Sequence, residues 1–309
     1  MKIQLNKTNK IAKMNRLIKY LDIILFKLKS LLGIDIQYKY KSVTIALPAG
    51  HMLPFYQKNF KNYDKFLPHL CSFIKSKATV VDVGANCGDT LASMYCENKE
   101  LTYVCIEPDD IFFKYLVENV ERIKRKNREA IVFTHKVLIG KSVSSAFLQG
   151  SGGTKHAVMN DDSDNSIISQ SLDDLLVHDD LVDVELLKSD VDGFDYDIVD
   201  SAETLINCYF PMIYMECDFR SLAQKTSYKI TIENLRLKGY MDWVVFDNFG
   251  EMVCRTNDIV IIDQLFEYTW RQRLSKASPT IYYFDVLAAT AKHRELIDVA
   301  VREYNKTNN

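Results

Sequence analysis

Residues Thr79–Thr90 read TVVDVGANCGDT, an apolar run that leads into two glycines and then into helix-forming residues. This order predicts a buried strand, a tight turn and a helix. Gly84 and Gly88 allow the backbone to approach a ligand closely, and Asn86 tolerates a left-handed conformation between them. Ligands of open α/β sheets bind in the crevice beyond the strand ends, so the turn predicts a binding site.

Further apolar runs alternate with helical segments after this turn. The runs cover 101–106, 131–139, 184–188 and 212–215, and helices are expected over 89–98, 111–124 and 196–208. Alternation of this kind predicts an α/β fold with a doubly wound, mainly parallel sheet of the Rossmann-like class. An N-terminal helix and a Ser-, Gly- and Asp-rich insertion over 140–170 are expected as additions at the rim.

Four regions are predicted along the chain. They are a basic amphipathic helix over 1–37, a cap segment over 38–77 with a helix over 56–75, the Rossmann-like domain over 78–262, and an extension over 263–309. We expect residues 38–60 and the 140–170 insertion to form a lid over the binding site.

The second apolar run ends in Glu107, about 20 residues after the glycines, where an acid can hydrogen-bond both hydroxyls of a ribose. Nicotinamide and S-adenosylmethionine binders share this pairing. The nicotinamide fingerprint G-x-G-x-x-G is absent, and Asp89 stands at the helix start, where it would repel a pyrophosphate. Asp82 and Asp89 suit a sulfonium and an α-amino group, with Asp82 orienting either the turn or that amino group. The sequence therefore favours S-adenosylmethionine, bound by Asp82, Gly84, Asn86, Gly88 and Glu107.

The chain resembles the FkbM-type methyltransferases over roughly residues 79–220. The resemblance rests on DVGANCGDT, IEP, SLDDLL, LLKSDVDGFDYDIV and PMIYMEC, in this order and spacing. It implies a class I methyltransferase fold and O-methylation from S-adenosylmethionine. It further implies a sugar hydroxyl as acceptor, in a polysaccharide, glycolipid or nucleotide-sugar precursor. The family wording D-V-E-G is replaced here by Asp190-Val191-Asp192-Gly193, which shortens one acid by a methylene.

Asp190, Glu216 and His51 are the predicted catalytic residues. An alcohol is a poor acid, so its methylation needs a base or a metal. In one hypothesis Asp190, Glu216 and Asp218 hold Mg²⁺, because hard oxygen ligands suit that ion. In the other, Asp190 caps the turn at Gly193 and the base lies elsewhere, with His51 as one possibility. Lys188 is expected to pair with an acid at the site or to emerge at an edge. Tyr282 and Tyr283 are expected either in the core or as a wall stacking on a sugar.

The charge distribution bears on partners. The net charge of −2 gives no sign of nucleic-acid binding, but residues 1–32 hold eight Lys or Arg and one acidic residue. A basic amphipathic helix of this kind predicts contact with an anionic membrane surface, or packing in a homodimer. Its charges argue against a membrane span. Seven unpatterned cysteines and no signal peptide predict a reducing, cytoplasmic location, with peripheral contact at the inner face of the membrane.

Two other functions remain open from the sequence. One is a nicotinamide-dependent oxidoreductase that modifies sugars, although no Tyr-x-x-x-Lys pair is visible on a helix. The other is a non-catalytic binding module on the same fold, since a fold alone does not determine an activity.

Overall fold

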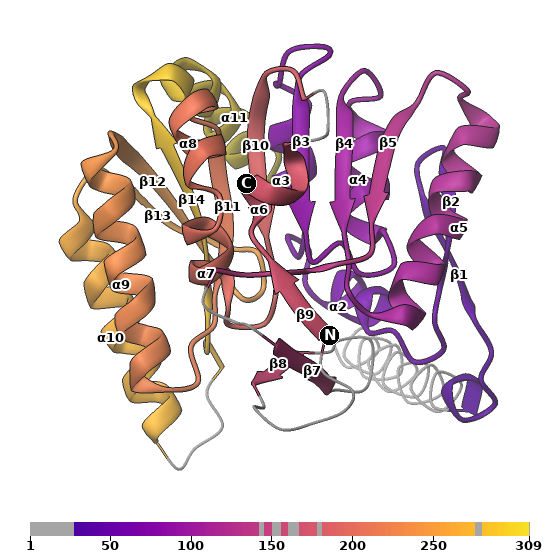
Figure 1. The fold of residues 1–309 in the computed structure, drawn as a ribbon, viewed down its shortest axis with the longest axis horizontal. Helices are drawn as coiled ribbons and strands as arrows, with labels where there is room; N and C mark the ends of the chain where they lie inside the picture. The colour runs from indigo at the N-terminus through magenta and orange to yellow at the C-terminus, as the bar shows by residue number, and fades with distance from the viewer. Residues whose placement is uncertain are drawn as a thin grey trace, which may run out of the picture.

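An eight-stranded sheet forms the centre of the molecule in the computed structural model, which describes residues 28–141, 145–149, 156–159, 167–177, 181–275 and 280–308. Its strand order is β13-β12-β14-β11-β10-β3-β4-β5 (Figure 1). The strands are β3 (Thr79–Val83), β4 (Thr102–Ile106), β5 (Ile131–His135), β10 (Val184–Ser189), β11 (Met212–Cys217), β12 (Tyr240–Asp247), β13 (Met252–Thr256) and β14 (Phe284–Thr290). The five strands from β11 to β5 are parallel, and β14 is antiparallel to both of its neighbours. This confirms the predicted doubly wound, mainly parallel Rossmann-like sheet.

Helices cover both faces of the sheet, which explains why β3 and β10 are buried along their whole length. Val80 and Leu186 point into the core on one face, and Val81 and Leu187 into the core on the other. The first face packs against α3 (Phe66–Cys71), α4 (Asp89–Glu97), α5 (Asp110–Lys126) and α11 (Arg294–Asn308). The second packs against α6 (Leu172–Leu176), α7 (Asp195–Asp200), α8 (Glu203–Tyr209), α9 (Leu222–Leu237) and α10 (Ile259–Leu274).

The C-terminal residues contribute to the central sheet. Strand β14 lies between β11 and β12, and η1 (Ala291–His293) and α11 follow it. The sheet therefore continues beyond the boundary predicted at residue 262. The short run Ile281–Phe284 gave no sign from its own composition that a strand beginning at Phe284 would be inserted between two earlier strands.

The helix predicted over 56–75 is two shorter helices, α2 (Leu53–Asn59) and α3. The chain turns between them at Asp64, whose φ is 54°. Pro68 lies in the first turn of α3, where the missing N–H costs nothing, whereas inside one long helix its ring would clash with the carbonyl four residues earlier. The prediction of one helix was wrong because it followed apolar spacing and ignored this proline.

The helix predicted over 196–208 is also divided, into α7 and α8. Ser201 follows α7, and its hydroxyl donates to the carbonyl of Ile198 at 2.8 Å and accepts from the amide of Leu172 at 3.2 Å. The serine thus satisfies backbone groups of two elements where the chain changes direction.

The N-terminal cap is a hairpin of β1 (Ile36–Tyr40) and β2 (Val43–Leu47) that packs against α4 and α5. The buried amide of Asn119 on α5 accepts from the Ala46 amide at 2.7 Å and donates to the Ala46 carbonyl at 2.8 Å. It also donates to the carbonyl of Cys87 at 2.8 Å. One side chain therefore joins the hairpin, α5 and the turn after β3.

The insertion predicted over 140–170 contains a hairpin of β7 (Ser145–Gln149) and β8 (His156–Met159). With β6 (Leu138–Ile139) and β9 (Ile167–Gln170) it forms a separate sheet in the order β6-β9-β7-β8. The basic helix predicted over 1–37 lies mostly outside the described residues. No helix in the described parts of the chain has the length and apolar character needed to cross a membrane.

Candidate active site

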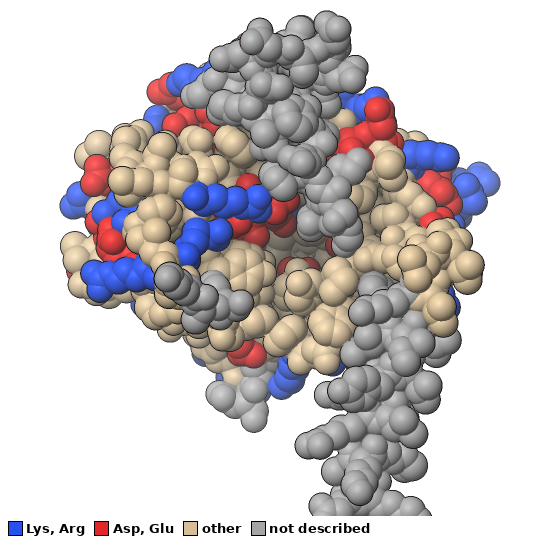
Figure 2. Space-filling view, turned by 90° about the horizontal axis from the view of Figure 1, so that it is seen from below, with Lys and Arg blue, Asp and Glu red and all other residues tan. Residues whose placement is uncertain are grey.

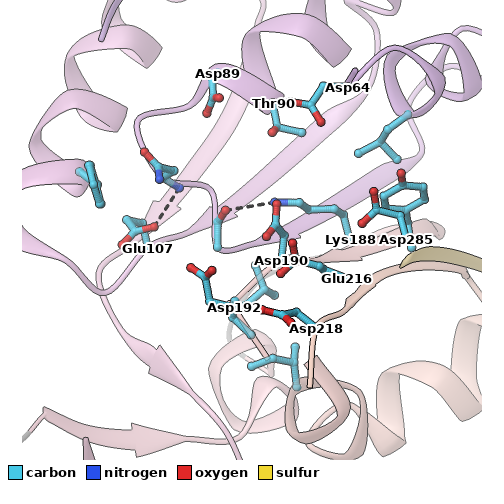
Figure 3. A pocket seen from close by; sticks show the side chains of 18 of the residues that line it. Asp64, Asp89, Thr90, Glu107, Lys188, Asp190, Asp192, Glu216, Asp218 and Asp285 are labelled. Atoms are coloured by element: carbon cyan, nitrogen blue, oxygen red, sulfur yellow. Dashed lines mark hydrogen bonds and ion pairs between the residues drawn. The ribbon is translucent and has the colours of Figure 1, made fainter. Parts of the chain in front are cut away.

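A cavity of about 420 Å³ opens beyond the carboxyl ends of β3, β4, β10 and β11. Figure 2 shows this opening with acidic side chains inside it. Its size is within the range of small-molecule sites. The lining carboxyl groups belong to Asp64, Asp89, Glu107, Asp190, Asp192, Glu216, Asp218 and Asp285 (Figure 3). Such a lining suits a ligand that carries positive charge or many hydroxyl donors.

The glycine turn closes one side of the cavity, and its backbone is left-handed at three positions. Gly84, Asn86 and Gly88 have φ values of 77°, 49° and 79°. A Cβ on Gly84 would lie 2.0 Å from the carbonyl oxygen of Asp190, so no side chain fits there. Gly84 and Asn86 line the cavity, whereas Gly88 caps α4 and packs against Leu116.

Glu107 lies at the end of β4 and holds the turn in place. Its Oε2 accepts from the Asn86 amide at 2.8 Å, and its Oε1 accepts from the Asp109 amide at 2.9 Å. Burial raises the pKa of Glu107 to about 7, although these two backbone N–H groups favour the ionised form. The side chain lines the cavity, and its binding to ribose hydroxyls stays a prediction.

Asp82 is fully buried behind the turn and is not part of the cavity wall. The Lys188 ammonium lies 2.9 Å from Asp82 Oδ1 and 3.7 Å from Asp190 Oδ2, and it donates to the Gly84 carbonyl at 3.0 Å. Of the two predicted roles of Asp82, this position agrees with orienting the turn, through Lys188. The expected pairing of Lys188 with an acid of the site is confirmed.

All three predicted catalytic residues line the cavity. The Asp190 side chain is half exposed, at 53%. Glu216 is only 8% exposed, and its Oε2 has no hydrogen-bond partner among the described residues. Burial, followed by the carboxylates of Asp190 and Asp192, raises the pKa of Glu216 well above its ordinary value. A buried carboxyl group beside other carboxylates holds its proton more tightly than one in water.

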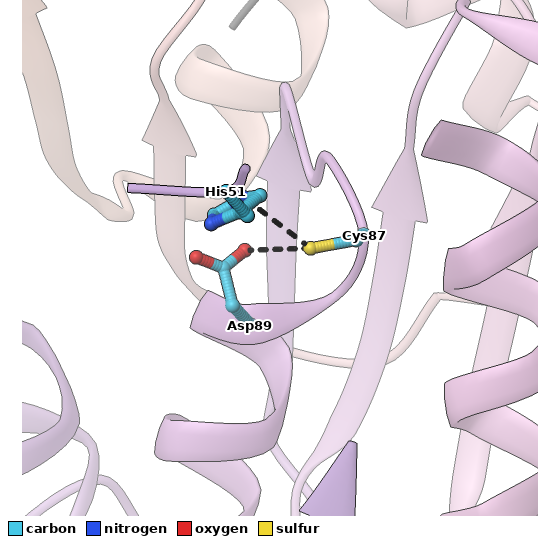
Figure 4. Close-up of side chains that lie close together, drawn as sticks. All are labelled: His51, Cys87 and Asp89. Atoms are coloured by element: carbon cyan, nitrogen blue, oxygen red, sulfur yellow. Dashed lines mark hydrogen bonds between the residues drawn. The ribbon is translucent and has the colours of Figure 1, made fainter. Parts of the chain in front are cut away.

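His51 is buried, and both of its ring nitrogens face protein atoms (Figure 4). Nδ1 accepts from the Leu53 amide at 3.3 Å, so Nε2 of the neutral ring carries the hydrogen and faces Cys87 Sγ at 3.6 Å. The Cys87 thiol in turn donates to Asp89 Oδ1 at 3.8 Å. The geometry is that of a hydrogen-bond chain ending at a cavity carboxylate.

The predicted magnesium ligands are not brought together. Asp218 forms an ion pair with Arg273 and another with Arg220, whose Nε lies 3.2 Å from Asp218 Oδ2. In the described parts of the chain, the group whose ligand atoms lie within 4.8 Å of one another is instead His51, Cys87 and Asp89. In this arrangement Asp190, Glu216 and Asp218 do not form such a group, and two guanidinium groups already neutralise Asp218.

Asp192, where the family wording has glutamate, has a φ of 54° and faces the cavity. The following Gly193 has a φ of 102°, and a Cβ there would lie 2.6 Å from the Asp218 carbonyl oxygen. Burial and the neighbouring Asp190 raise the pKa of Asp192 to about 6. This acid therefore belongs to the same electrostatic group as Asp190 and Glu216.

Sequence reasoning missed Asp64, Tyr63 and Asp285. Asp64 and Tyr63 lie in the turn between α2 and α3, which the prediction placed inside a helix. Asp285 comes directly after the aromatic run, of which Tyr282 and Tyr283 line the cavity as one of the two predictions had it. For Asp285 the available signal was a single acid directly after an apolar run, the same signal that identified Glu107, Asp190 and Glu216.

Solved methyltransferase structures are similar to this chain at low identity. The methyltransferase FkbM of Methylobacillus flagellatus is 17% identical with a TM-score of 0.37, and the match covers 60% of this chain and 52% of that one. The METTL16 methyltransferase domain is 14% identical with a TM-score of 0.43, over 80% and 73% of the two chains. The plantazolicin methyltransferase BpumL, solved with SAH, is 11% identical with a TM-score of 0.38, over 77% and 88%. A search of curated protein sequences returned no significant match.

The family assignment comes from the sequence profile. The profile described as "Methyltransferase FkbM domain" matches residues 82–241, which is more than half of the chain. The matched stretch runs from the buried acid behind the glycine turn to the start of β12, and so includes the turn, Glu107, Asp190 and Glu216. A parallel sheet with its cavity beyond the strand ends, together with this match, shows that the chain belongs to the FkbM family of methyltransferases.

Proposed function

We propose that this protein is an S-adenosylmethionine-dependent O-methyltransferase whose acceptor is a hydroxyl group of a carbohydrate. S-adenosylmethionine supplies an electrophilic methyl group on a positively charged sulfur. The observation that carries the proposal is the cavity itself: a turn without room for a side chain at Gly84 faces walls of carboxylates.

The residues present fit this donor. Glu107 stands where ribose hydroxyls can donate to it, and Gly84 and Asn86 offer backbone to the methionine part. Asp89 and Asp190 supply negative charge for the amino group and the sulfonium. Among the described residues that line the cavity, the two long cations are already paired, Lys188 with Asp82 and Arg220 with Asp218, so they offer little positive charge to a pyrophosphate.

Binding measurements test the donor directly. We expect isothermal titration calorimetry to show binding of S-adenosylhomocysteine and none of NAD to the full-length chain. Binding of NAD alone would support the oxidoreductase alternative and remove this proposal. Binding of S-adenosylhomocysteine without turnover on any acceptor would support a non-catalytic module.

The acceptor is proposed to enter beside the ends of β10, β11 and β14. Tyr56, Tyr63, Tyr282 and Tyr283 line this side of the cavity together with carboxyl groups, a combination that can stack on a sugar ring and accept its hydroxyl protons. Release of S-adenosylhomocysteine should be measured over a panel of neutral glycosides, glycolipid headgroups and nucleotide sugars. No release with any sugar, but release with a non-carbohydrate alcohol, would overturn this acceptor class.

A peripheral membrane contact is proposed for residues 1–32, on their charge alone. Deletion of these residues should release the protein from anionic vesicles in a sedimentation assay without changing its affinity for S-adenosylhomocysteine. A change from dimer to monomer on deletion, with vesicle binding unaffected or absent, would instead assign the segment to a homodimer.

A further inference from the structure

Glu216 of β11 and Asp285 of β14 are opposed residues on neighbouring antiparallel strands. Opposed side chains project from the same face of a sheet, with their Cβ atoms about 5 Å apart. Both side chains line the cavity, and Figure 3 shows them on the same side of it as Lys188. Two carboxyl groups from strands far apart in the sequence therefore share one wall.

This pair is poorly compensated. Glu216 is buried, and its Oε2 lacks a hydrogen-bond partner among the described residues. Burial, followed by the charges of Asp190 and Asp64, also raises the pKa of Asp285 well above its ordinary value. Two adjacent carboxylates with so little compensation do not both ionise, because each charge disfavours the other.

Most charged groups that face the pair from the surrounding elements favour its protonated form. Asp190, Asp192 and Asp195, at the end of β10 and the start of α7, add negative charge, as does Asp64 from the cap. The Lys188 ammonium opposes them, but it is held between Asp82 and Asp190.

Two phenols complete the surroundings. Tyr63 from the cap and Tyr283 beside β14 interact electrostatically with both members of the pair. Their own pKa values are raised well above 10, so they remain neutral and do not oppose proton retention by the pair.

We propose that Glu216 and Asp285 form a carboxyl pair that holds one proton at neutral pH, and that its ionised member takes the proton of the acceptor hydroxyl. This rests on the proposed function and names a base for it. The hydroxyl oxygen bonds to the methyl carbon of S-adenosylmethionine, the carbon–sulfur bond breaks, and its electron pair stays on sulfur as neutral S-adenosylhomocysteine. The hydroxyl proton ends on the carboxylate, so that both members are then protonated until one proton leaves to water.

The protonation state can be measured without any acceptor. In infrared spectra at pH 7, the C=O band of protonated carboxylic acids should lose the intensity of one group in the Glu216→Gln/Asp285→Asn double variant. Asp263→Asn is the matched control: this α10 carboxylate is half exposed and pairs with Lys229 at 3.1 Å, so its removal should leave the band unchanged. No loss, or a loss of two groups, in a double variant that keeps its fold would overturn the pair.

Kinetics with an acceptor identified from the sugar panel test the base. Glu216→Gln should lower kcat by about 10²–10⁴-fold, the usual contribution of general base catalysis, while the Kd of S-adenosylhomocysteine changes less than threefold. Asp285→Asn should also lower kcat and move the acidic limb of the pH–rate profile to lower pH, because Glu216 then ionises more easily. A merely structural role would not move this limb.

The outcomes separate the two proposals. If the wild type binds S-adenosylhomocysteine and methylates a sugar, but both single variants keep its kcat and its pH profile, the carboxyl pair is wrong and the proposed function stands. If the wild type neither binds the nucleoside nor transfers a methyl group, the proposed function is wrong, and the base assigned to it falls as well.

Discussion

The two halves of the cavity satisfy their carboxyl groups in opposite ways. On the turn side, each oxygen of Glu107 accepts a hydrogen bond from a backbone N–H. The two donors, Asn86 and Asp109, are close to Glu107 in the sequence. On the other side, Glu216 and Asp285 come from separate strands, and Glu216 Oε2 has no hydrogen-bond partner among the described residues. The first arrangement suits a rigid holder for a ligand, and the second suits a group that exchanges a proton. Variants should therefore affect stability and donor binding on the first side, and rate on the second.

Removing the Lys188 ammonium should have the largest effect, because it joins the two halves. Lys188→Met leaves Asp82 as an uncompensated buried charge, which typically costs about 3–5 kcal/mol of the free energy of unfolding. Urea denaturation measures this loss. The Asp82→Asn/Lys188→Met double variant should recover much of it, and a single-variant loss below about 1 kcal/mol would contradict a buried ion pair.

A methyl group at Gly84 should damage the turn side specifically. Gly84→Ala places a Cβ against the Asp190 carbonyl, so it should cost about 1–3 kcal/mol more than Gly239→Ala. Gly239 is the matched control because its φ is also positive, at 96°, but a Cβ there would meet no atom within 4 Å. Thermal unfolding of both variants isolates the steric effect from the backbone strain, and equal losses would mean that the contact with Asp190 is not formed.

Glu107 tests donor binding alone. Glu107→Gln exchanges one acceptor oxygen for an amide, so a backbone N–H or a ribose hydroxyl loses its partner. The affinity for S-adenosylhomocysteine should fall roughly 10- to 100-fold in calorimetry, as expected for a lost bond to a charged group. Glu118→Gln, on the exposed surface of α5, should bind like the wild type. An unchanged affinity in Glu107→Gln would remove the ribose assignment.

The smallest expected effect is a pH dependence on the acceptor side. Asp64 is exposed to solvent but lines the cavity, where partial desolvation and the carboxylates of Asp89 and Asp190 raise its pKa from 3.8 to about 7. A carboxyl group with a raised folded-state pKa stabilises the fold fully below pH 3.8, and this stabilisation is lost as the pH rises to about 7.

Asp64→Asn should therefore show a smaller decrease of Tm across this pH interval than the wild type. Asparagine tolerates the left-handed backbone at this position, so the substitution adds no strain. A steeper decrease in the variant would contradict the raised pKa.

The same contrast explains what the sequence could predict. The turn and Glu107 lie within one strand–helix–strand unit, so local composition and spacing were enough to place them. Asp285 depends on β14 being inserted between β11 and β12. Asp64 depends on the break between α2 and α3, before Pro68, which apolar periodicity conceals. The ion pair of Asp218 could not be predicted for the same reason, because its partner Arg273 is 55 residues away in the sequence.

The amide of Asn119 makes the hairpin and the ligand-facing turn parts of one mechanical unit. It accepts from the Ala46 N–H and donates to the Ala46 carbonyl, and it also donates to the Cys87 carbonyl in the glycine turn. Opening of the hairpin would leave that buried carbonyl without its partner at the moment when the turn must keep its shape. Opening of this hairpin is therefore expected to disturb the glycine turn as well, and under the proposed function a bulky acceptor would enter from the side of β14.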